Sequence, residues 1–375
     1  MKIVLAPDSF KESMTASQAV AAMRDGVLSV WPDAECVGVP MADGGEGTVD
    51  AVVDALDGER IGVDVCDALG RPVLAHYGFI ADQRLAVVEM AAAAGLELIA
   101  PADRDVLRAS TFGVGQLITS ALDHGATDLL IGLGGSATND GGAGMLAALG
   151  AAFYDADDAP LPPGGAALSR LQRIELSGLD PRLAEVRIRI ASDVTAPLLG
   201  EGGASAVFGP QKGATADDVE VLERGLSRLV AVTESTLGAA HPERAGAGAA
   251  GGLGFGLMDF LGAECHPGVE MIAETVRLDQ AVAGADWVFT GEGSVDAQTM
   301  LGKTPFGVAR AAVRAGARVV IFAGRVAPDA DVLLAHGVDR LVGITAAATP
   351  IEQALREGAQ SLTRATAAVC REIAG

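Results

Sequence analysis

The sequence predicts an α/β protein in which a doubly wound parallel-sheet domain, made from both ends of the chain, carries a second α/β domain inserted into it. Three observations carry this prediction. Short apolar runs alternate with segments of helical periodicity near both termini. The stretch between them begins with apolar segments spaced like antiparallel strands. The length of 375 residues suits two or three domains rather than one.

The N-terminal segment follows the alternation of strand and helix. Residues 3–6 form a short apolar run that predicts a buried parallel strand, and residues 36–41 predict a second one. Ser17 fits the N-cap position of a helix that continues to Leu28. Residues 48–56 have the periodicity of another helix.

The middle of the chain opens with apolar segments at 61–65, 73–79 and 85–90, which predict an antiparallel group with a turn at 70–72. Helices are then expected at 114–122, 143–149 and 216–235, and strands at 129–133 and 187–191. Residues 245–256 are rich in glycine. They fit either a flexible linker or a loop pressed against a ligand ahead of a helix at 257–261.

The alternation resumes near the C-terminus, with strands expected at 287–290, 319–323 and 340–344 and a long helix from about residue 351. We therefore expect one domain made of residues 1–60 and 262–375. Residues 61–261 form the second domain, which carries the most glycine-rich loop.

The composition excludes several classes of protein. A formal net charge of −22 argues against nucleic acid and against an anionic membrane as partners, because both need a basic face. No apolar stretch reaches the roughly 18 residues of a transmembrane helix, and the apolar run at the N-terminus is too short for a signal peptide. The four cysteines form no CxxC pair and no HExxH occurs, so neither a zinc site nor a disulfide framework is indicated. We expect a cytoplasmic protein with reduced thiols.

Polar and glycine-rich segments follow most of the predicted strands. Because ligands of open parallel sheets bind at the carboxyl ends of the strands, these segments are candidates for one binding site. They are residues 8–11, 43–47, 134–142, 192–195, 290–294 and 324–325. Each alone fits ordinary turn chemistry, and their repetition at one kind of edge indicates a site.

Residues 132–144 form the segment richest in glycine and small polar residues. A glycine-rich loop between a strand and a helix allows backbone N–H groups to point at phosphate oxygens. Ser136, Thr138 and Asn139 could add side-chain donors. The alternative is a capped tight turn that holds no ligand.

Residues 132–137 also satisfy a dinucleotide-binding pattern. Asp155 lies at the distance where such proteins carry the acid that binds the ribose. The pattern requires a helix to open near its second glycine, whereas here polar residues and glycines extend the loop to residue 142. An NAD-dependent dehydrogenase acting on a small hydroxy acid therefore stays open as an alternative.

Lysine is rare, with only four among the 27 Lys and Arg residues. Lys11, Lys212 and Lys303 lie in loops rich in glycine or serine. A compact ammonium group suits a crowded phosphate better than a guanidinium fork does. Residues 291–304 resemble a Walker A loop that lacks its first glycine, and Pro305 fits the first turn of a following helix.

Five acidic residues in these loops, Asp8, Asp43, Asp193, Glu292 and Asp296, are candidates for the chemistry. Phosphoryl transfer uses Mg²⁺ held by one or two carboxylates and a group that accepts the proton of the attacking hydroxyl. Asp193 ends an apolar strand, where the pKa of a carboxyl can rise, so we favour it as the base. A helix cap or turn former is the alternative for each of these acids.

Six segments together identify a resemblance that covers essentially the whole chain. They are APDSFKES (6–13), MADGGEGT (41–48), IGLGGSATNDGGAG (131–144), SDVTAPL (192–198), GPQKGA (209–214) and TGEGSVDAQTMLGKTP (290–305). In this order and spacing they resemble the bacterial glycerate kinase family, of the type with two α/β domains, one of them flavodoxin-like or Rossmann-like.

The resemblance implies ATP-dependent phosphorylation of D-glycerate with Mg²⁺. The usual bacterial product is 2-phosphoglycerate, and 3-phosphoglycerate is the alternative. The partner is then a small-molecule substrate, with no nucleic acid and no membrane, and we expect a monomer or a homodimer. A non-catalytic binding protein for small acids is a further alternative, since two α/β lobes around a cleft also suit solute receptors.

Combining the resemblance with the loop chemistry gives each candidate a role, with the site expected in a cleft between the two domains. The predicted catalytic residues are Asp193, Lys303 and Lys11. The residues expected to bind ATP are Gly134, Gly135, Ser136, Thr138, Asn139, Gly291 and Gly293. Those expected to bind glycerate or the transferred phosphoryl group are Asp8, Ser9, Arg71 and Lys212, while Asp43 and Glu292 are expected to bind Mg²⁺.

Overall fold

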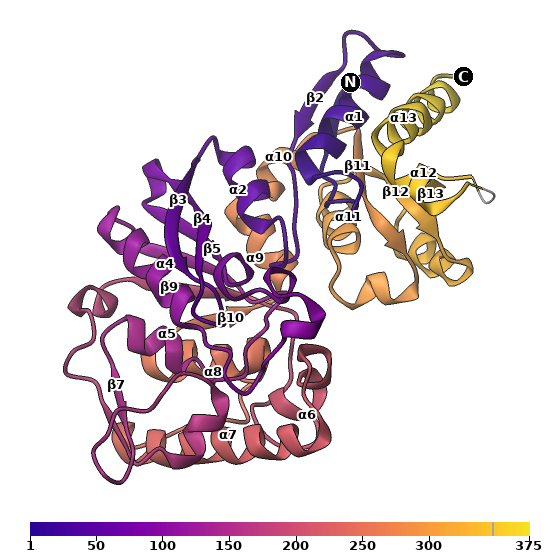
Figure 1. Cartoon of the computed structure of the whole chain (residues 1–375). Coiled ribbons are helices and arrows are strands. Elements are labelled where there is room, and N and C mark those ends of the chain that lie inside the picture. The colour runs from indigo at the N-terminus through magenta and orange to yellow at the C-terminus, as the bar shows by residue number, and fades with distance from the viewer. Residues whose placement is uncertain (347–348) are drawn as a thin grey trace. The chain divides into compact units, whose positions relative to one another are not determined.

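A computed structural model describes residues 1–346 and 349–375 (Figure 1). The chain divides into two compact units, each with its own sheet and core. The first unit consists of residues 1–43, 50–58 and 267–375, and the second of residues 44–49 and 59–266. Both are of the α/β class with parallel strands, which confirms the predicted fold class.

The first unit is built on a five-stranded sheet to which both ends of the chain contribute. Its strands are β1 (Lys2–Leu5), β2 (Glu35–Gly38), β11 (Trp287–Val295), β12 (Arg318–Val326) and β13 (Arg340–Gly343). All pairings are parallel, and the order is β2-β1-β11-β12-β13. This is the flavodoxin-like order, in which the direction of winding reverses between the first and third strands.

The helices of this unit are α1 (Ala16–Leu28), α2 (Thr48–Leu56), α9 (Gly268–Thr275), α10 (Leu278–Val282), α11 (Thr304–Arg314), α12 (Ile351–Arg356) and α13 (Gly358–Ala374). Helices α1 and α13, from opposite ends of the chain, lie side by side (Figure 1). A Cβ on Gly26 of α1 would lie 2.7 Å from the Cβ of Thr366, so glycine is needed for this close approach. Leu362 and Cys370 of α13 are fully buried in the same core as Phe289 and Phe322.

The second unit contains a six-stranded mixed sheet in the order β10-β9-β6-β5-β4-β3. Its strands are β3 (Glu59–Cys66), β4 (Pro72–Ile80), β5 (Leu85–Glu89), β6 (Asp128–Gly132), β9 (Arg187–Ala191) and β10 (Glu264–His266), and β7 (Ala152–Tyr154) and β8 (Arg173–Glu175) form a separate antiparallel pair. Strand β4 is antiparallel to both neighbours, as predicted. Strands β3, β5, β6 and β9 therefore present their carboxyl ends at one edge.

The helices of the second unit are α3 (Ala91–Ala94), α4 (Phe112–Asp123), α5 (Ala143–Ala148), α6 (Ala204–Phe208), α7 (Ala216–Leu237) and α8 (Ala249–Leu261). Helices α4 and α5 pack together, and their apolar faces join the largely buried strands of the sheet in one extensive core. None of the helices in the described residues is both long and apolar enough to cross a bilayer. Cys36, Cys66, Cys265 and Cys370 are all free thiols.

Some predicted elements differ from the structure. The strand expected at 36–41 is β2 and ends at Gly38, and the helix expected at 257–261 is α8 and begins at Ala249. Thr15, not Ser17, caps α1, because its side chain accepts from the Gln18 N–H while Gln18 bonds back to the Thr15 N–H in a capping box. The long helix expected from residue 351 is broken at Glu357 into α12 and α13.

The glycine-rich segment 245–256 forms part of the folded second unit. Ala247 and Ala249 are fully buried, and Ala250, Gly251 and Gly252 all have left-handed backbone angles inside α8. A Cβ on Gly251 would lie 2.0 Å from the carbonyl oxygen of Thr138, so the segment packs tightly against the glycine-rich loop. The linker interpretation is therefore wrong, and the segment is a support for that loop.

Candidate functional site

In the first unit, the predicted site residues gather where the strand order reverses. Strand β1 leads directly into Asp8 and Ser9, and its neighbour β11 carries Glu292 near its carboxyl end. In flavodoxin-like sheets this reversal leaves a crevice at the carboxyl ends of the strands, where ligands bind. The topology of the sheet therefore brings together two acids that are far apart in sequence.

Asp8 is fixed by hydrogen bonds to both of its carboxylate oxygens. The Ser9 N–H donates to Oδ1 at 2.6 Å, and the Thr304 hydroxyl donates to Oδ2 at 2.6 Å. Burial, reinforced by repulsion from the nearby Asp43 carboxylate, raises the pKa of Asp8 to about 6. Asp8, Ser9 and Asp43 thus belong to one electrostatic cluster, and Thr304 at the start of α11 is part of it.

Glu292 pairs with Lys303 in the same cluster. The Lys303 ammonium lies 3.7 Å from Glu292 Oε1, and the Thr299 hydroxyl donates to the same oxygen at 3.3 Å. Burial is the main cause that raises the pKa of Glu292 to about 7, and Asp8 and Asp43 add to it while Lys303 opposes it. The Lys303 side chain is 38% exposed, so its ammonium is accessible as well as paired.

The remaining candidates of this unit have different surroundings. Lys11 is exposed at the surface. A Cβ on Gly291 would lie 2.2 Å from the Phe322 carbonyl oxygen, so this glycine serves the packing of β11 on β12. Gly293 has more space, with the Lys11 N–H nitrogen 3.6 Å from the position of a Cβ.

In the second unit, the glycine-rich loop lies at the carboxyl edge of the sheet, directly after β6. A Cβ on Gly132 would lie 2.5 Å from the Gly44 carbonyl oxygen, and one on Gly134 would lie 2.7 Å from the Gly45 Cα. The backbone of residues 44–45 therefore crosses over the loop in van der Waals contact. Gly135 is exposed with φ of +72°, whereas Ser136 is only 8% exposed.

The end of this loop is an internal network. Thr138 and Asn139 are fully buried, and the Asn139 amide donates to Ser205 at 3.0 Å. The Thr138 hydroxyl and the Asn139 side-chain oxygen have no hydrogen-bond partner among the described residues. These two buried side chains therefore support the loop from the interior of the second unit.

Lys212 belongs to the same interior. It is 2% exposed, and its ammonium donates to the Thr138 carbonyl oxygen at 2.7 Å. Burial lowers the pKa of Lys212 to about 7, although the Asp140 carboxylate opposes the shift. Asp140 in turn accepts hydrogen bonds from the N–H groups of Thr111, Gly142 and Gly144, and burial raises its pKa.

Asp193 and Arg71 lie elsewhere on the second unit. Asp193 is exposed just beyond the carboxyl end of β9, and its charge raises the pKa of the neighbouring Cys265 thiol in addition to the effect of burial. Arg71 follows β3 and bonds through Nε to the buried Asp67 at 2.6 Å. Asp67 also accepts from the N–H groups of Leu69 and Arg71, so this pair closes a tight turn.

The structure gives no support to the dinucleotide interpretation. Asp155 accepts from the N–H groups of Asp157 and Ala159, which makes it the organiser of the turn after β7. Strand β7 pairs only with β8 and is not a neighbour of β6, as the acid-bearing strand of a dinucleotide fold must be. After β6, the next helix in the described part of the chain begins only at Ala143, beyond the pattern and not near its second glycine.

Several members of these networks escaped the sequence analysis. Thr299 carries no signal of its own. Thr304 follows Lys303 at the end of the Walker A-like segment, a position that could have marked it. Asp140 and its partner Thr111 are 29 residues apart. The signal that could have marked Asp140 as a structural anchor is an aspartate followed directly by two glycines, which is typical of a turn organised by the carboxylate.

Comparisons with known proteins agree over the whole chain. The sequence model of the Glycerate kinase family matches residues 3–374. A glycerate kinase of Bacillus subtilis (strain 168) is 48% identical over 97% of this chain and 95% of its own length. The glycerate 2-kinase of Escherichia coli (strain K12) is 43% identical over 100% and 98%, respectively. A crystal structure assigned as glycerate kinase 2 from Salmonella typhimurium LT2 superposes with a TM-score of 0.91 at 44% identity, covering 100% of this chain and 98% of that one.

The clustered acids and lysine at the edge of an α/β sheet suit phosphoryl transfer, and the comparisons show the class of a phosphotransferase. The two relatives named above match 97% and 100% of this chain at 48% and 43% identity, so the similarity is not limited to one domain. The chain belongs to the glycerate kinase family and is an ATP-dependent kinase.

Proposed function

We propose that this protein transfers the γ-phosphoryl group of ATP to the 2-hydroxyl of D-glycerate and releases 2-phosphoglycerate and ADP. The observation that carries the proposal is the cluster of Asp8, Glu292, Lys303 and Thr304 at the reversal of the first sheet. The 2-hydroxyl is chosen because a relative that covers the whole chain is a glycerate 2-kinase. The 3-hydroxyl is the competing product position.

The phosphates of ATP are proposed to bind to two sets of groups. Lys303 offers an exposed ammonium beside Glu292. Gly134, Gly135 and Ser136 offer backbone N–H groups at the carboxyl edge of the second sheet, with Thr138 and Asn139 supporting them from below. Gly291 and Gly293 are proposed to keep the chain beside Lys303 free of side chains.

Magnesium is proposed as the metal of the reaction. Across residues 1–346 and 349–375, no group of three or more His, Cys, Asp or Glu side chains is arranged to hold a metal. Mg²⁺ in kinases is held by one or two carboxylates together with phosphate oxygens and water, and Asp43 and Glu292 supply the hard oxygen donors that this requires. Asp43 and Glu292 each repel Asp8, so a bound cation would stabilise the ionised form of these carboxylates. The bound ion would neutralise charge on the transferring phosphoryl group.

Glycerate is proposed to be held by Lys11, Ser9 and Arg71 through its carboxylate and hydroxyls, with Asp8 orienting Ser9 and Lys212 fixing the loop. Asp193 is proposed to accept the proton of the attacking hydroxyl. Its exposed position after β9 leaves the carboxylate accessible to a substrate. Lys11 and Lys303 would stabilise charge on the phosphoryl group during transfer.

One assay tests the proposed function. The purified protein is mixed with ATP, Mg²⁺ and D-glycerate, and ATP consumption is followed while ³¹P NMR identifies the product. We expect ATP use that depends on glycerate and a single phosphomonoester on the 2-hydroxyl. A 3-phosphoglycerate signal would correct the position, and no glycerate-dependent turnover would contradict the function.

The setting of the enzyme is also part of the proposal. Free thiols and an acidic surface suit a reducing compartment, so we propose the cytoplasm. The proposed substrate is a small molecule, and the net charge of −22 argues against nucleic acid as a partner. A monomer or homodimer is proposed, and light scattering would measure which.

A further inference from the structure

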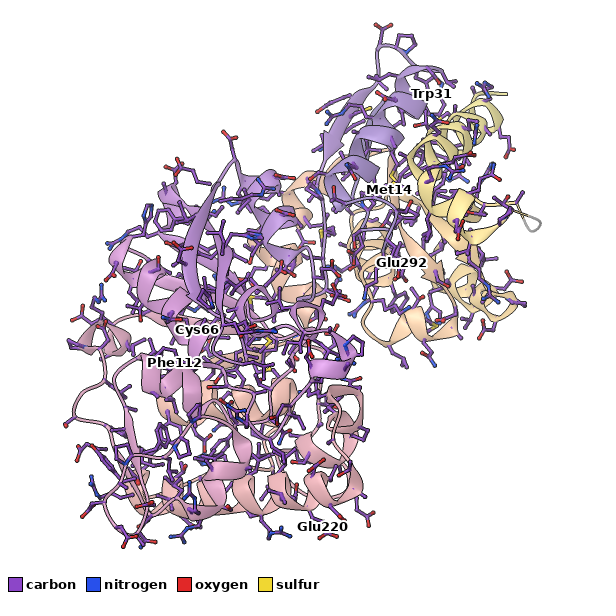
Figure 2. All side chains as sticks on the ribbon, viewed as in Figure 1. Met14, Trp31, Cys66, Phe112, Glu220 and Glu292 are labelled. Atoms are coloured by element: carbon purple, nitrogen blue, oxygen red, sulfur yellow. The ribbon has the colours of Figure 1, made fainter. Side chains whose placement is uncertain are left out.

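We infer that a semi-enclosed cavity within the second unit binds the adenosine moiety of ATP, an inference that rests on the proposed kinase function. The cavity has a volume of about 500 Å³, within the range of small-ligand sites. Its walls are formed by the turn after β3, the first residue of α4, one face of α5 and the segment 161–164. Cys66 and Phe112, two of the residues that line it, are labelled in Figure 2.

The walls have the chemistry that a purine base requires. Phe112, Phe153 and Leu168 present apolar surfaces, together with Leu161, Pro162 and Pro163. Flat apolar walls accept an aromatic ring by burial and stacking, while a few polar groups set its orientation. The cavity is therefore suited to an uncharged planar group rather than to a phosphate or a small acid.

Polar groups occur at defined places on these walls. The side chain of Ser110 is 6% exposed and accepts from the Phe112 N–H at 3.3 Å, which leaves its hydroxyl proton for a ring nitrogen of the ligand. Asp103 and Asp105 line the cavity as well and supply acceptors for the amino group or the ribose hydroxyls. Arg108 is exposed at the rim and offers a guanidinium to the first phosphate.

The cavity lies beside the proposed phosphate loop within one unit. Ala143, Gly144 and Ala147 of α5 form one wall, and α5 begins immediately after the glycine-rich loop. Asp140 of that loop accepts from the N–H groups of Thr111 and Gly144, so loop and cavity share a rigid network. The turn at residues 67–70 follows β3, whose carboxyl end lies at the same sheet edge as the loop. One nucleotide could therefore place its base in the cavity and its phosphates on the loop.

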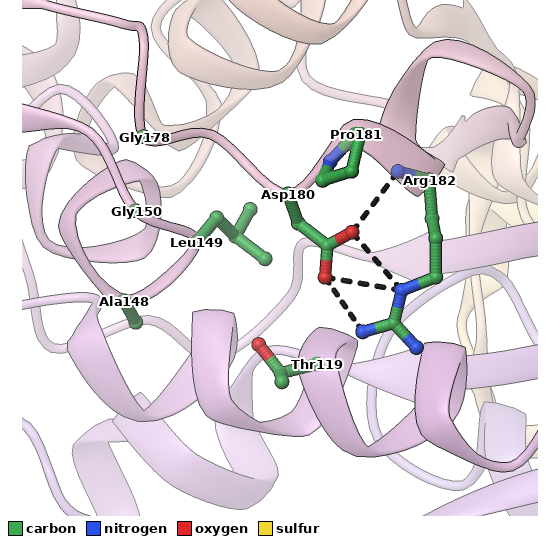
Figure 3. A pocket seen from close by; sticks show the side chains of 8 residues that line it. All are labelled: Thr119, Ala148, Leu149, Gly150, Gly178, Asp180, Pro181 and Arg182. Carbon is green, nitrogen blue, oxygen red and sulfur yellow. Dashed lines mark hydrogen bonds and ion pairs between the residues drawn. The ribbon is translucent and has the colours of Figure 1, made fainter.

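A second cavity of the same volume provides the control. It lies between α4, the end of α5 and the segment 178–182 that follows β8, and Thr119, Asp180 and Arg182 are among the residues that line it (Figure 3). Asp180 and Arg182 bond to each other along one wall, at 2.6 Å between Oδ2 and Nη2, so these charged groups already satisfy one another. Thr119 in this cavity and Ala147 in the first are both half-buried helical residues.

The experiment compares Ala147→Phe with Thr119→Phe in the full-length protein. If the cavity holds adenosine, the Ala147 variant raises KM for ATP by about tenfold or more, with kcat and KM for glycerate within about twofold of wild type. The Thr119 variant leaves all three unchanged. An unchanged KM for ATP in a folded Ala147→Phe protein would overturn the inference while the proposed function still stands.

A second measurement keeps the inference testable if the Ala147 variant does not fold. The wild-type protein is irradiated with 8-azido-ATP, and the labelled peptides are identified by mass spectrometry. We expect labels within residues 66–70, 108–112 or 161–164, and protection by unmodified ATP. Labels confined to other segments would overturn the inference. Loss of glycerate-dependent ATP use in the wild type would instead contradict the kinase function on which it rests.

Discussion

At the scale of single residues, environment separates side chains of the same type. Lys303 is 38% exposed and pairs with Glu292, whereas Lys212 is 2% exposed and donates to a backbone carbonyl. The exposed ammonium of Lys303 fits its proposed contact with ATP, whereas the ammonium of Lys212 bonds to the glycine-rich loop from inside. The rarity of lysine marked both as candidates, but only packing distinguishes their roles. The partners of Asp8 were equally hidden, since Thr304 is 296 residues away in sequence.

The proposed base gives the first prediction at this scale. Asp193→Asn removes a proton acceptor but keeps the size and shape of the side chain. We expect kcat to fall by about 10²- to 10⁴-fold, the usual contribution of general-base catalysis, with KM for glycerate nearly unchanged. Asp155→Asn, in the turn after β7, is the control and leaves kcat unaltered. A kcat of Asp193→Asn close to wild type would remove Asp193 from this role.

Lys212 gives a prediction for stability against pH. Burial lowers its pKa to about 7, from 10.5 in an exposed lysine, so between these values the unfolded chain binds a proton that the folded protein does not. The free energy of unfolding therefore rises with pH in this window, by at most about 1.4 kcal/mol per pH unit from this group. Below pH 7 both states bind this proton, and the loss of stability caused by the buried Lys212 amine has its full value.

Chemical denaturation of wild type and Lys212→Met between pH 6.5 and 10 would measure this effect. The variant retains the apolar stem but has no titrating amine. We expect the free energy of unfolding of the variant to rise less steeply with pH than that of wild type, because the variant lacks the amine that titrates. The contributions of all other titrating groups cancel when the two curves are subtracted. Parallel curves for the two proteins would contradict a lowered pKa at Lys212.

At the scale of elements, the sequence predicted most strands and helices because their periodicity is local. It also located the loops that follow the strands. It did not predict how loops support one another, since this depends on contacts between distant segments. Residues 249–252 show this: their glycines resemble a linker, yet Gly251 packs against Thr138. Residues 44–45 likewise cross over Gly132 and Gly134, contacts that no periodicity reveals.

The crossing of loops gives a prediction for the element scale. A Cβ on Gly134 would lie 2.7 Å from the Gly45 Cα, so Gly134→Ala must displace the phosphate loop. We expect KM for ATP to rise by about tenfold with a smaller change in KM for glycerate. Gly202→Ala is the matched control, because no atom lies within 4 Å of its Cβ position. Equal kinetics for the two variants would show that the loop does not contact ATP.

At the scale of the whole molecule, the first unit depends on both ends of the chain. Strand β1 pairs with β2 on one side and with β11 on the other, and α13 covers the same core as α1. The doubly wound pattern at both termini allowed this arrangement to be predicted from sequence. The core of the second unit is made from residues 65–263 and does not include these segments.

Removal of α13 tests this dependence. A chain ending at Glu357 loses Leu362, Val369 and Cys370 from the core of the first unit. We expect fast hydrogen exchange in β1, β11 and β12, while β6 and α7 of the second unit stay protected. Loss of protection in β6 as well would show that the two units do not fold separately, and full protection of β11 would show that α13 is dispensable.

The strand order of the first sheet has a consequence during translation. Strands β1 and β2 leave the ribosome early, but Ile3 must wait for Trp287 to emerge before it gains its second neighbour. At about 5–20 residues per second, this delay is on the order of tens of seconds, enough time for the inserted unit to fold first. Until β11 emerges, the apolar strand β1 stays open on one side and is exposed to pairing with other chains.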